Sequence, residues 1–337
     1  MKRLFAFGLT ALLSLGSAHA GTLENVRQKG SVSCGVNVGL GGFSMPDSKG
    51  IWKGLDVDAC RAVAAAVLGD AEKVRYVPTT GTSRFAALQS GEIDILARNT
   101  TFTFVRDATI GLRMVMVNFY DGQGFLVRKD AKVGSLKDLA GGTICMLQGS
   151  THELNLTDWM KQHKIDFKIV LLDTTDVLIK TMLSGRCDAA SSDSSNLASI
   201  RGAGVPVPDD FVILPDRISK EPLGPMVRRG DDQWFDVVRW SMMAMIEAEE
   251  DGITAANADQ MLAESSNPTV QRLLGKSGDF GKLMGLDNAW ALNIIKQVGN
   301  YSESYERTVG KDSSLKLDRG PNALWSKGGL MYPVPFR

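Results

Sequence analysis

Neither sign of charge is in excess in this sequence, which holds 38 Lys and Arg residues and 38 Asp and Glu residues. Proteins that bind nucleic acids or anionic membranes gather basic residues on one surface, and this balance does not favour such a surface. Beyond residue 20 the sequence also lacks an apolar run of about 18 residues, the shortest that is expected to span a bilayer. These absences argue against a nucleic-acid-binding protein and against a membrane-spanning one.

Signatures of enzymes are scarce as well. His152 and His163 are the only histidines after residue 20, and neither belongs to an H-E-x-x-H zinc motif. There is no G-x-S-x-G sequence, the turn that carries the nucleophile of α/β-hydrolases. Gly275-Lys276-Ser277 resembles the end of a phosphate-binding loop, but Val270 stands where that loop needs a glycine. We therefore expect no catalytic residue, no cofactor and no metal ion.

The first twenty residues have the three parts of a secretory signal peptide. Lys2-Arg3 is followed by an apolar run from Leu4 to Leu15 and by the cleavage site Ala18-His19-Ala20. Cleavage after Ala20 removes two basic residues and no acidic ones, which leaves a slight acidic excess. Position 21 is Gly21 rather than the cysteine of a bacterial lipoprotein. We predict export to the periplasm of a Gram-negative bacterium, without a lipid anchor.

One short phrase occurs twice in the remaining sequence. Ser90-Gly91-Glu92-Ile93-Asp94 and Ser184-Gly185-Arg186-Cys187-Asp188 share the form S-G-x-x-D, and each follows an apolar helical stretch. Each precedes a short strand that ends in small polar residues, Asn99-Thr100-Thr101 in the first copy and Ser191-Ser192-Asp193 in the second. Ligands of open α/β sheets bind at the carboxyl ends of strands. The repetition predicts two lobes that present polar strand ends to a shared cleft, as a clamp for a small polar molecule.

Strands and helices alternate through both predicted lobes, which indicates a mostly parallel sheet flanked by helices in each lobe. Gly124–Arg128 is expected to be a strand that leaves lobe one, and a second crossing is expected near Pro222–Arg228. Two crossing strands form a hinge about which lobes can close on a ligand. The expected division is a signal peptide (1–20), lobe one (21–127), lobe two (128–223), a return to lobe one (224–264) and a C-terminal extension on lobe one (265–337).

Hydrophobic periodicity and turn residues set the individual elements. The predicted strands cover residues 31–38, 74–78, 93–97, 144–147, 167–172 and 188–190. The predicted helices cover residues 56–68, 82–90, 136–139, 151–162, 175–183 and 232–250. Within the C-terminal extension the only strong helix signal is Leu286–Val298.

The four cysteines all follow the signal peptide, and export favours disulfide bonds. Four cysteines allow three pairings, which the domain division can narrow. Cys34 and Cys60 fall on the first strand and first helix of lobe one, whereas Cys145 and Cys187 fall on strands of lobe two. We therefore predict the disulfides Cys34–Cys60 and Cys145–Cys187. Zinc ligation is the alternative, which the absence of a C-x-x-C spacing disfavours.

Two charged residues follow the polar strand ends. Arg106 comes five residues after Thr101, and its planar guanidinium suits the carboxylate of an amino acid, to which the amide and hydroxyl of Thr101 can add. Asp193 ends the second unit and would face Arg106 across the cleft as the partner of an ammonium group. The alternatives are a surface arginine and a helix-capping aspartate. A cation on one lobe and an anion on the other would fit a zwitterion.

Other polar positions divide into a candidate site and structural residues. Gly149-Ser150-Thr151 precedes a helix, so its amides and hydroxyls offer an anion site, or cap the helix, or do both. Asp94 and Asp188 lie at the starts of their strands, away from the predicted cleft, where turn chemistry accounts for them.

With these residues in place, the chain resembles the periplasmic amino-acid-binding proteins of ABC importers, the solute-binding protein family 3. The resemblance covers about residues 30–250. It rests on the order and spacing of Gly54–Asp58, Ala87–Asp94, Thr101–Arg106, Leu139–Gly142, Gln148–Thr151 and Gly185–Ala189. The phrases Ala97–Thr101 and Asp121–Phe125, together with the long C-terminal extension, further resemble the general L-amino-acid-binding subgroup.

The resemblance implies the two-lobed periplasmic binding protein fold and roles for particular residues. Arg106 and Thr101 would bind the α-carboxylate with help from the Thr151 amide, beside Ser150 in the same anion site. Asp193 and the carbonyl of Asn99 would hold the α-ammonium group. An aromatic residue often packs on the ligand side chain in this family, and Phe43 falls at that position.

One departure from the family concerns the helix that contains Arg84. Many relatives have a bulky aromatic residue three positions before this arginine, where the present chain has Gly81. We expect the missing side chain to widen the pocket and to favour broad specificity. Arg84 itself is expected either to reach acidic ligand side chains or to lie at the surface.

The sequence thus predicts a monomeric receptor that captures L-amino acids in the periplasm and hands them to the membrane permease of an ABC importer. Two other functions stay open. An enzyme on the same scaffold, such as a periplasmic dehydratase of a small carboxylic acid, would use His152 as its acid or base. A sensor domain would need an output segment, and no such segment follows in the sequence.

Overall fold

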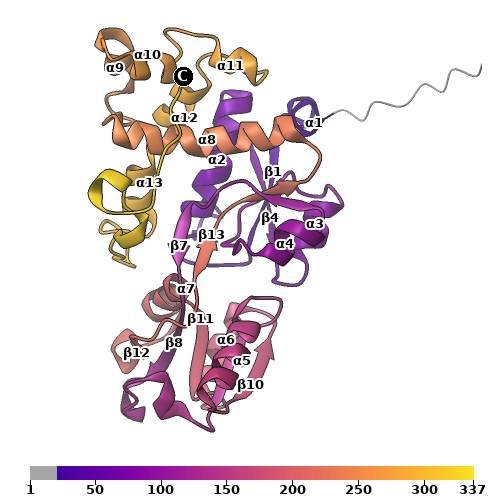
Figure 1. The fold of residues 1–337 in the computed structure, drawn as a ribbon, viewed down its shortest axis with the longest axis vertical. Coiled ribbons are helices and arrows are strands. Elements are labelled where there is room, and N and C mark those ends of the chain that lie inside the picture. Colours follow the sequence, from indigo (N-terminus) through magenta and orange to yellow (C-terminus); the bar gives the residue numbers. More distant parts are fainter. Residues whose placement is uncertain (1–20) are drawn as a thin grey trace, which may run out of the picture.

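The computed structural model describes residues 21–337, so the predicted signal peptide (1–20) lies outside the described residues. Figure 1 shows two lobes, one above the other, joined by a narrow pair of strands. No helix in the described part of the chain is long and apolar enough to cross a membrane. The two-lobed fold predicted from the sequence is confirmed.

Lobe one contains a five-stranded sheet with the strand order β4-β1-β5-β14-β6. The central strand β1 pairs in parallel with β4 and β5, whereas β14 runs antiparallel to β5 and β6. The strands are β1 (Val32–Asn37), β4 (Val74–Thr79), β5 (Ile95–Leu96), β6 (Leu112–Met114) and β14 (Met226–Arg228). Helices α1 (Thr22–Lys29), α2 (Leu55–Leu68), α3 (Arg84–Gln89) and α4 (Phe104–Thr109) and the short pair β2 (Met45–Pro46) and β3 (Trp52–Lys53) complete this part.

Lobe two repeats this plan with the strand order β10-β9-β11-β8-β12. Its strands are β8 (Gln123–Arg128), β9 (Thr143–Leu147), β10 (Lys168–Leu172), β11 (Ala189–Asp193) and β12 (Phe211–Ile213). Its helices are α5 (His152–His163), α6 (Thr175–Leu183) and α7 (Ser194–Ser199), followed by a π-helical turn (Ile200–Gly204). Short 3-10 turns cover Lys129–Ala131, Leu136–Leu139 and Pro208–Asp210.

The hinge lies a few residues earlier than the sequence suggested. Its two strands are β7 (Phe119–Asp121) and β13 (Glu221–Leu223), which pair antiparallel. The strand Gly124–Arg128, expected to leave lobe one, is instead part of β8 in the sheet of lobe two, where Gln123 lies opposite Asp193. Because β8 runs away from the hinge and β11 runs back toward it, this pairing is antiparallel. Both sheets are therefore mixed rather than mostly parallel.

The repeated S-G-x-x-D phrase has the same structural role in both lobes. Asp94 accepts a hydrogen bond from the backbone N–H of Ser33 at the start of β1, at 2.9 Å. Asp188 accepts one from the N–H of Thr143 at the start of β9, at 2.7 Å. In each lobe the aspartate thus joins the start of one strand to the start of its neighbour, at the ends remote from the cleft.

Each lobe contains one disulfide, as predicted. Cys34 in β1 bonds to Cys60 in α2, and Cys145 in β9 bonds to Cys187 just before β11. The four residues are buried in the cores of their lobes. The zinc alternative is therefore wrong, since all four sulfurs are used.

The chain after β14 packs on lobe one. α8 (Asp232–Glu250) and α12 (Trp290–Val298) contact α2, and apolar residues of all three helices share one core. The extension contains more helix than the sequence indicated, because its short helices begin at local side-chain caps such as Asn267 and Asn300 rather than showing long periodicity. The additional helices of the extension are α10 (Pro268–Leu273), α11 (Phe280–Leu283) and α13 (Tyr301–Thr308), and α9 (Ala258–Glu264) directly precedes it.

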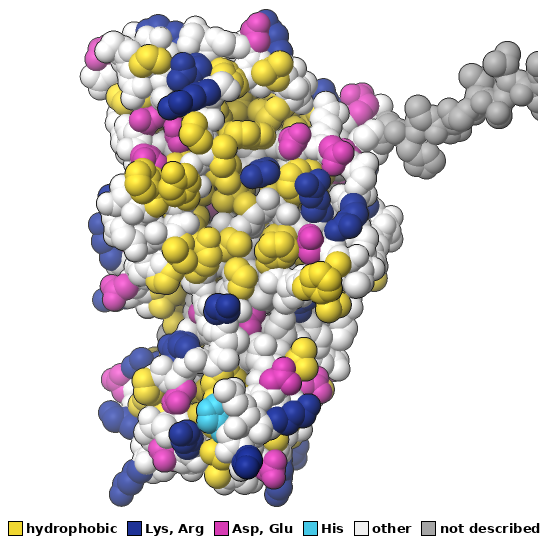
Figure 2. Space-filling view, viewed as in Figure 1, with side chains coloured by type: hydrophobic (Ala, Val, Ile, Leu, Met, Phe, Trp, Pro, Cys, Tyr) yellow, Lys and Arg dark blue, Asp and Glu magenta, His cyan; other side chains and the backbone are white. Residues whose placement is uncertain are grey.

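The extension also reaches the hinge and the surface. The side chain of Asn322 accepts a hydrogen bond from the backbone N–H of Tyr120 in β7 at 2.6 Å and donates one to its carbonyl at 3.1 Å. On the face in Figure 2, apolar side chains gather over the upper body, whereas basic and acidic side chains are intermixed on the lower lobe. Exposed apolar residues of the extension include Leu283, Trp325, Leu330 and Tyr332.

Candidate functional site

A polar cleft lies between the lobes and holds about 400 Å³ of space between atoms, part of it open to solvent. Residues at its walls lie at or just beyond the carboxyl ends of strands: Asn37 ends β1, Asn99 and Thr101 follow β5, and Asp193 ends β11. This is where the sheet topology places ligands. The cleft is lined by Asn37, Gly81, Arg84, Arg98, Asn99, Thr101, Arg106, Leu147, Gln148, Ser150, Thr151, His152, Ser192, Asp193 and Asn196.

Arg106 is buried in the cleft wall rather than lying at the surface. It falls in the first turn of α4, where its backbone N–H donates to the capping side chain of Thr103. Its guanidinium donates to the carbonyl of Thr101 at 3.0 Å and to that of Gly149, in lobe two, at 3.4 Å. Burial lowers the pKa of Arg106, and the charges of Glu221 and Asp193 partly offset this effect.

Two further arginines extend the positive wall. Arg84, only 3% exposed, donates to the carbonyl of Gly149 at 3.0 Å and to the hydroxyl of Thr100 at 3.4 Å. Burial, followed by the charges of Arg98 and Arg106, lowers the pKa of Arg84 well below its usual value. Burial likewise lowers the pKa of Arg98 to about 10. Within the described residues none of the three guanidinium groups has an ion pair, and burying unpaired cations is costly. The wall therefore favours an anionic ligand group.

Asp193 supplies negative charge from the opposite lobe. It is 3% exposed, and its carboxylate accepts a hydrogen bond from the side-chain amide of Asn99 at 3.3 Å and lies 3.2 Å from Nε2 of His152. Asp193 makes no side-chain capping bond to α7, so the capping alternative is wrong. Asp121 of β7 takes that role, because its carboxylate accepts hydrogen bonds from the N–H groups of Ser194 and Ser195.

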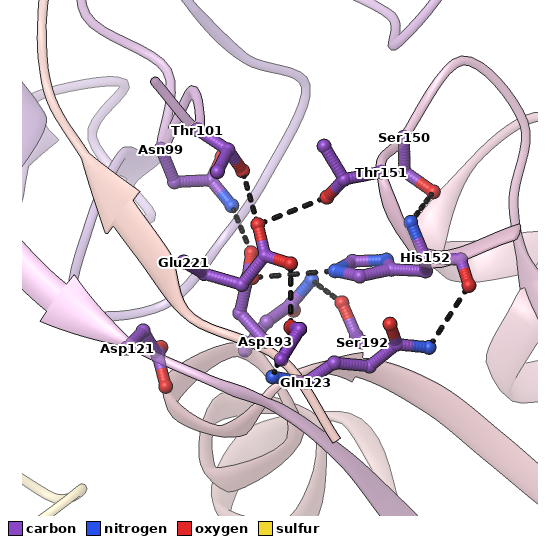
Figure 3. A network of polar contacts seen from close by, with 12 residues as sticks. Asn99, Thr101, Asp121, Gln123, Ser150, Thr151, His152, Ser192, Asp193 and Glu221 are labelled. Carbon is purple, nitrogen blue, oxygen red and sulfur yellow. Dashed lines mark hydrogen bonds and ion pairs between the residues drawn. The ribbon is translucent and has the colours of Figure 1, made fainter. Parts of the chain in front are cut away.

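Asn99 holds an unusual backbone conformation at the end of β5. Its φ of 34° lies in the left-handed region, which asparagine tolerates better than most residues. Its N–H donates to Asp56 at 3.0 Å. This turn brings the Asn99 side chain into the cleft against Asp193 of the other lobe (Figure 3).

Glu221, the first residue of β13, lies at the centre of the network in Figure 3. Its Oε2 accepts hydrogen bonds from the hydroxyls of Thr101 in lobe one, at 2.6 Å, and Thr151 in lobe two, at 2.9 Å. Its Oε1 accepts from Asn155 and Ser219, both at 2.7 Å. The carboxylate of this hinge residue therefore positions predicted ligand-binding threonines of both lobes at once.

His152, Asp193 and Glu221 are the one group within the described residues with the spacing to hold a metal ion, their ligand atoms lying within 4.8 Å of one another. A carboxylate has about four acceptor positions, and four donors already occupy those of Glu221. Nε2 of His152 points to Asp193. The donor set is thus accounted for as a hydrogen-bond network and fits a metal ion poorly.

Polar atoms without partners mark where a ligand would bind. Buried polar groups are normally hydrogen-bonded, and leaving one unpaired costs about 1–3 kcal/mol. Five such atoms line the cleft without a hydrogen-bond partner in residues 21–337: Asn37 Oδ1, Arg84 Nε, Asn99 Oδ1, His152 Nδ1 and Asn196 Oδ1. Three of the five are amide oxygens, which need hydrogen-bond donors from a ligand.

The two lobes touch at the rim of the cleft, which corrects the expectation for Gly81. A Cβ atom at Gly81 would lie closer than 3.0 Å to the carbonyl oxygen of Gln148, and one at Gly149 would lie 2.8 Å from the carbonyl of Gly81. The space of the missing aromatic side chain is thus filled by backbone of the other lobe. The glycine permits close approach of the lobes instead of widening the pocket.

The expectation for Phe43 is also wrong. Its ring is 1% exposed and packs edge-on against Phe119, with centroids 5.2 Å apart, in the core of lobe one. The turn after β1 is held by hydrogen bonds between Leu40 and Ser44, which direct the ring inward. The other six predicted ligand residues, Arg106, Thr101, Asn99, Asp193, Thr151 and Ser150, all line the cleft.

Sequence reasoning missed several residues of the site. Asn37 and Asn196 lie beside polar strand ends, so the rule that located Asn99 and Asp193 could have found them. Arg98 directly precedes Asn99 but was not predicted to line the cleft. Glu221 had no signal, because its role depends on the hinge that brings Thr101 and Thr151 together.

The chain is similar to known proteins of one family. A model of the bacterial extracellular solute-binding proteins, family 3, matches residues 32–260. The chain belongs to this family. That assignment agrees with the resemblance seen in the sequence and covers lobe two and most of lobe one.

Full-length relatives in family 3 are similar over the extension as well. The glutamate/glutamine/aspartate/asparagine-binding protein BztA of Rhodobacter capsulatus is 50% identical over 339 residues, 100% of each chain. The general L-amino acid-binding periplasmic protein AapJ of Rhizobium johnstonii is 51% identical over 331 residues, 97% of this chain and 96% of that one. A solved ABC transporter periplasmic binding protein from Brucella ovis, with glutathione bound, is 48% identical with a TM-score of 0.92 and covers 95% of this chain and 100% of that one.

Proposed function

We propose that this protein binds L-amino acids in the cleft between its lobes and delivers them to the permease of an ABC importer. The principal support for this proposal is that Arg106 and Asp193 are both buried in one cleft and come from opposite lobes. The guanidinium would bind the α-carboxylate together with the backbone N–H groups of Thr101, Ser150 and Thr151, and Asp193 with Asn99 would bind the α-ammonium group. Hydrogen bonds to charged groups are worth about 1.5–3 kcal/mol each.

The side-chain end of the ligand would meet Arg84. This guanidinium is buried without an ion pair in the described chain, and Asn37 and Asn196 present amide oxygens to the same cleft. A side-chain carboxylate or carboxamide would satisfy Arg84, which makes acidic amino acids and their amides preferred ligands. The similarity to BztA and AapJ supports this range of ligands.

Contacts made only in the closed state would explain how binding drives closure. The ligand would join Arg106 of lobe one to Thr151 and Asp193 of lobe two, so it would stabilise the closed form by the contacts that the open form lacks. Transport would follow export through the signal peptide, with the protein acting as a monomer in the periplasm. The periplasmic relative AapJ supports this location.

An enzymatic function is the second candidate, because His152 lies in the cleft beside Asp193. The relatives at about half identity are named as binding proteins, which favours binding over catalysis. A dehydratase-like activity would convert a small carboxylic acid during incubation with the protein. Product detected by mass spectrometry, and lost in His152→Gln, would favour the enzyme.

A thermal-shift screen of the twenty amino acids, followed by titration calorimetry, tests the proposed function. A ligand that binds only the folded protein raises its melting temperature. Arg106→Ala should then weaken the binding of every amino acid by more than about 2 kcal/mol. The matched control is Arg128→Ala, since Arg128 lies on the surface of lobe two in an ion pair with Asp130. No shift with any amino acid, or near-normal affinity in Arg106→Ala, would refute the proposal.

A further inference from the structure

A second groove adjoins the cleft and has no part in the binding of an amino-acid head. It lies between Leu40 and Met45 of lobe one and the π-helical turn and α6 of lobe two, with about 920 Å³ of space that is partly open to solvent. Its lining includes Ile179, Leu183 and Ile200, so much of its surface is apolar. This groove is larger than the cleft itself.

The groove and the cleft are neighbours along two chain segments. Asn37 lines the cleft and Gly39, two residues later, lines the groove. Asn196 lines the cleft and Ile200, about one helical turn later, lines the groove. Two extended residues and one helical turn each span about 6 Å. An extended ligand chain of about five bonds spans this distance.

The junction is marked by acceptors that lack donors. The amide oxygens of Asn37 and Asn196 are buried, come from opposite lobes and have no hydrogen-bond partner in the described residues. A carboxylate cannot satisfy them, since it has no hydrogen to donate. An amide N–H would satisfy one of them, and an amide carbonyl would accept from Nε of Arg84, which also lines the cleft and lacks a partner in the described residues. The chemistry at this point therefore suits an amide.

The groove also offers polar partners beyond the junction. Thr175, at the start of α6, is 6% exposed, and its buried hydroxyl has no hydrogen-bond partner among the residues described. Lys180 and Asp176 of the same helix line the groove, and neither forms an ion pair in the described chain. A terminal carboxylate would suit Lys180 and Thr175, and further N–H groups would suit Asp176.

We infer that the groove binds the distal residue of a peptide joined to its head amino acid through the side chain, such as a γ-glutamyl dipeptide. The inference rests on the proposed function, in which Arg106 and Asp193 hold the α-carboxylate and α-ammonium groups. A peptide bond to either α group removes one of these charges, so only a side-chain linkage keeps both. An apolar distal side chain would contact Leu40, Met45 and Ile179, with its carboxylate at Lys180.

Calorimetry with glutamate, γ-glutamyl-leucine and α-glutamyl-leucine tests this inference. Wild-type protein should bind glutamate and γ-glutamyl-leucine, and should bind the α-linked isomer at least a hundredfold more weakly. Lys180→Gln should raise the dissociation constant of γ-glutamyl-leucine about tenfold relative to that of glutamate. Lys161→Gln, an exposed lysine of α5 outside the groove, is the control and should leave this ratio unchanged.

The outcomes separate this inference from the proposed function. If glutamate binds but γ-glutamyl-leucine does not, or if Lys180→Gln leaves the ratio at its wild-type value, the groove is not a ligand site. Equal binding of the α-linked isomer would contradict the requirement for a free head. If neither glutamate nor any other amino acid binds, the proposed function fails and the inference fails with it. Thr175→Val is a second variant for the same measurement, since it removes the hydroxyl of Thr175 and keeps the shape of the side chain.

Discussion

Gly81→Ala is expected to prevent full closure of the lobes while leaving each lobe folded. The three heavy atoms nearest to an added Cβ all belong to lobe two, at Gln148 and Gly149. Gly81 does not occupy the left-handed region that disfavours side chains. The substitution is therefore compatible with the fold of lobe one by itself, and its cost falls on the closed state.

The magnitude follows from the contacts at this point. The added methyl group would overlap the carbonyl of Gln148, so the lobes must separate there until the atoms reach ordinary contact distance. Gly149 is the adjacent residue, and its carbonyl accepts hydrogen bonds from Arg84 at 3.0 Å and Arg106 at 3.4 Å. Loss of one charged hydrogen bond of about 1.5–3 kcal/mol corresponds to a ten- to hundredfold weaker ligand affinity.

Calorimetry on Gly81→Ala measures this loss, and small-angle scattering with saturating ligand reports closure. Gly134→Ala is the matched control, because its Cβ would meet only Asp138 at an ordinary 3.6 Å. The control should bind as the wild type does, and melting temperatures without ligand should be similar for all three proteins. Wild-type affinity in Gly81→Ala would show that close approach at this glycine is not needed for binding.

Two other substitutions test the charges. Arg84→Met keeps the apolar stem of the side chain and removes its charge. In calorimetry it should weaken the binding of glutamate by about 2 kcal/mol more than the binding of leucine. Equal losses for the two ligands would show that Arg84 does not contact the ligand side chain. Burial, with the charges of Asp251 and Glu250, raises the pKa of Glu247 from 4.5 to about 7. Because the folded-state pKa is the higher one, ionisation costs stability as pH rises through this range. Glu247→Gln should thus add about 1 kcal/mol of unfolding free energy at pH 8 and almost none at pH 4, measured by urea denaturation; an equal gain at both pH values would contradict this reasoning.

The predicted elements were most accurate where apolar periodicity is long. The helix expected at 232–250 is α8 with the same bounds, and the one expected at 175–183 is α6. Short helices of the extension were missed, because α10 and α13 begin at single capping side chains and owe their stability to packing on lobe one. The predicted boundary between the lobes lies a few residues too late in the sequence. An apolar strand such as β8 has the same sequence pattern in either sheet, and only its pairing partners show that it belongs to lobe two.

Local sequence patterns likewise predicted some residues of the candidate site and not others. Polar residues at strand ends could be recognised locally, and Asn99, Thr101 and Asp193 were found by this rule. Phe43 was misplaced because an aromatic residue in a turn can point inward or outward, and packing against Phe119 decides. Glu221 escaped notice because three of its four donors, Thr101, Thr151 and Asn155, lie far from it in the sequence.

By itself the sequence determined the two repeated units, the disulfide in each lobe and the strand ends that carry the binding groups. These features depend on periodicity, turn chemistry and spacing, which act over a few residues. Only the tertiary structure decided how the lobes meet: the glycine contact at the rim, the carboxylate of the hinge residue between two threonines, and the groove beside the cleft. Such features arise where distant segments pack, and no local pattern encodes the distance between them.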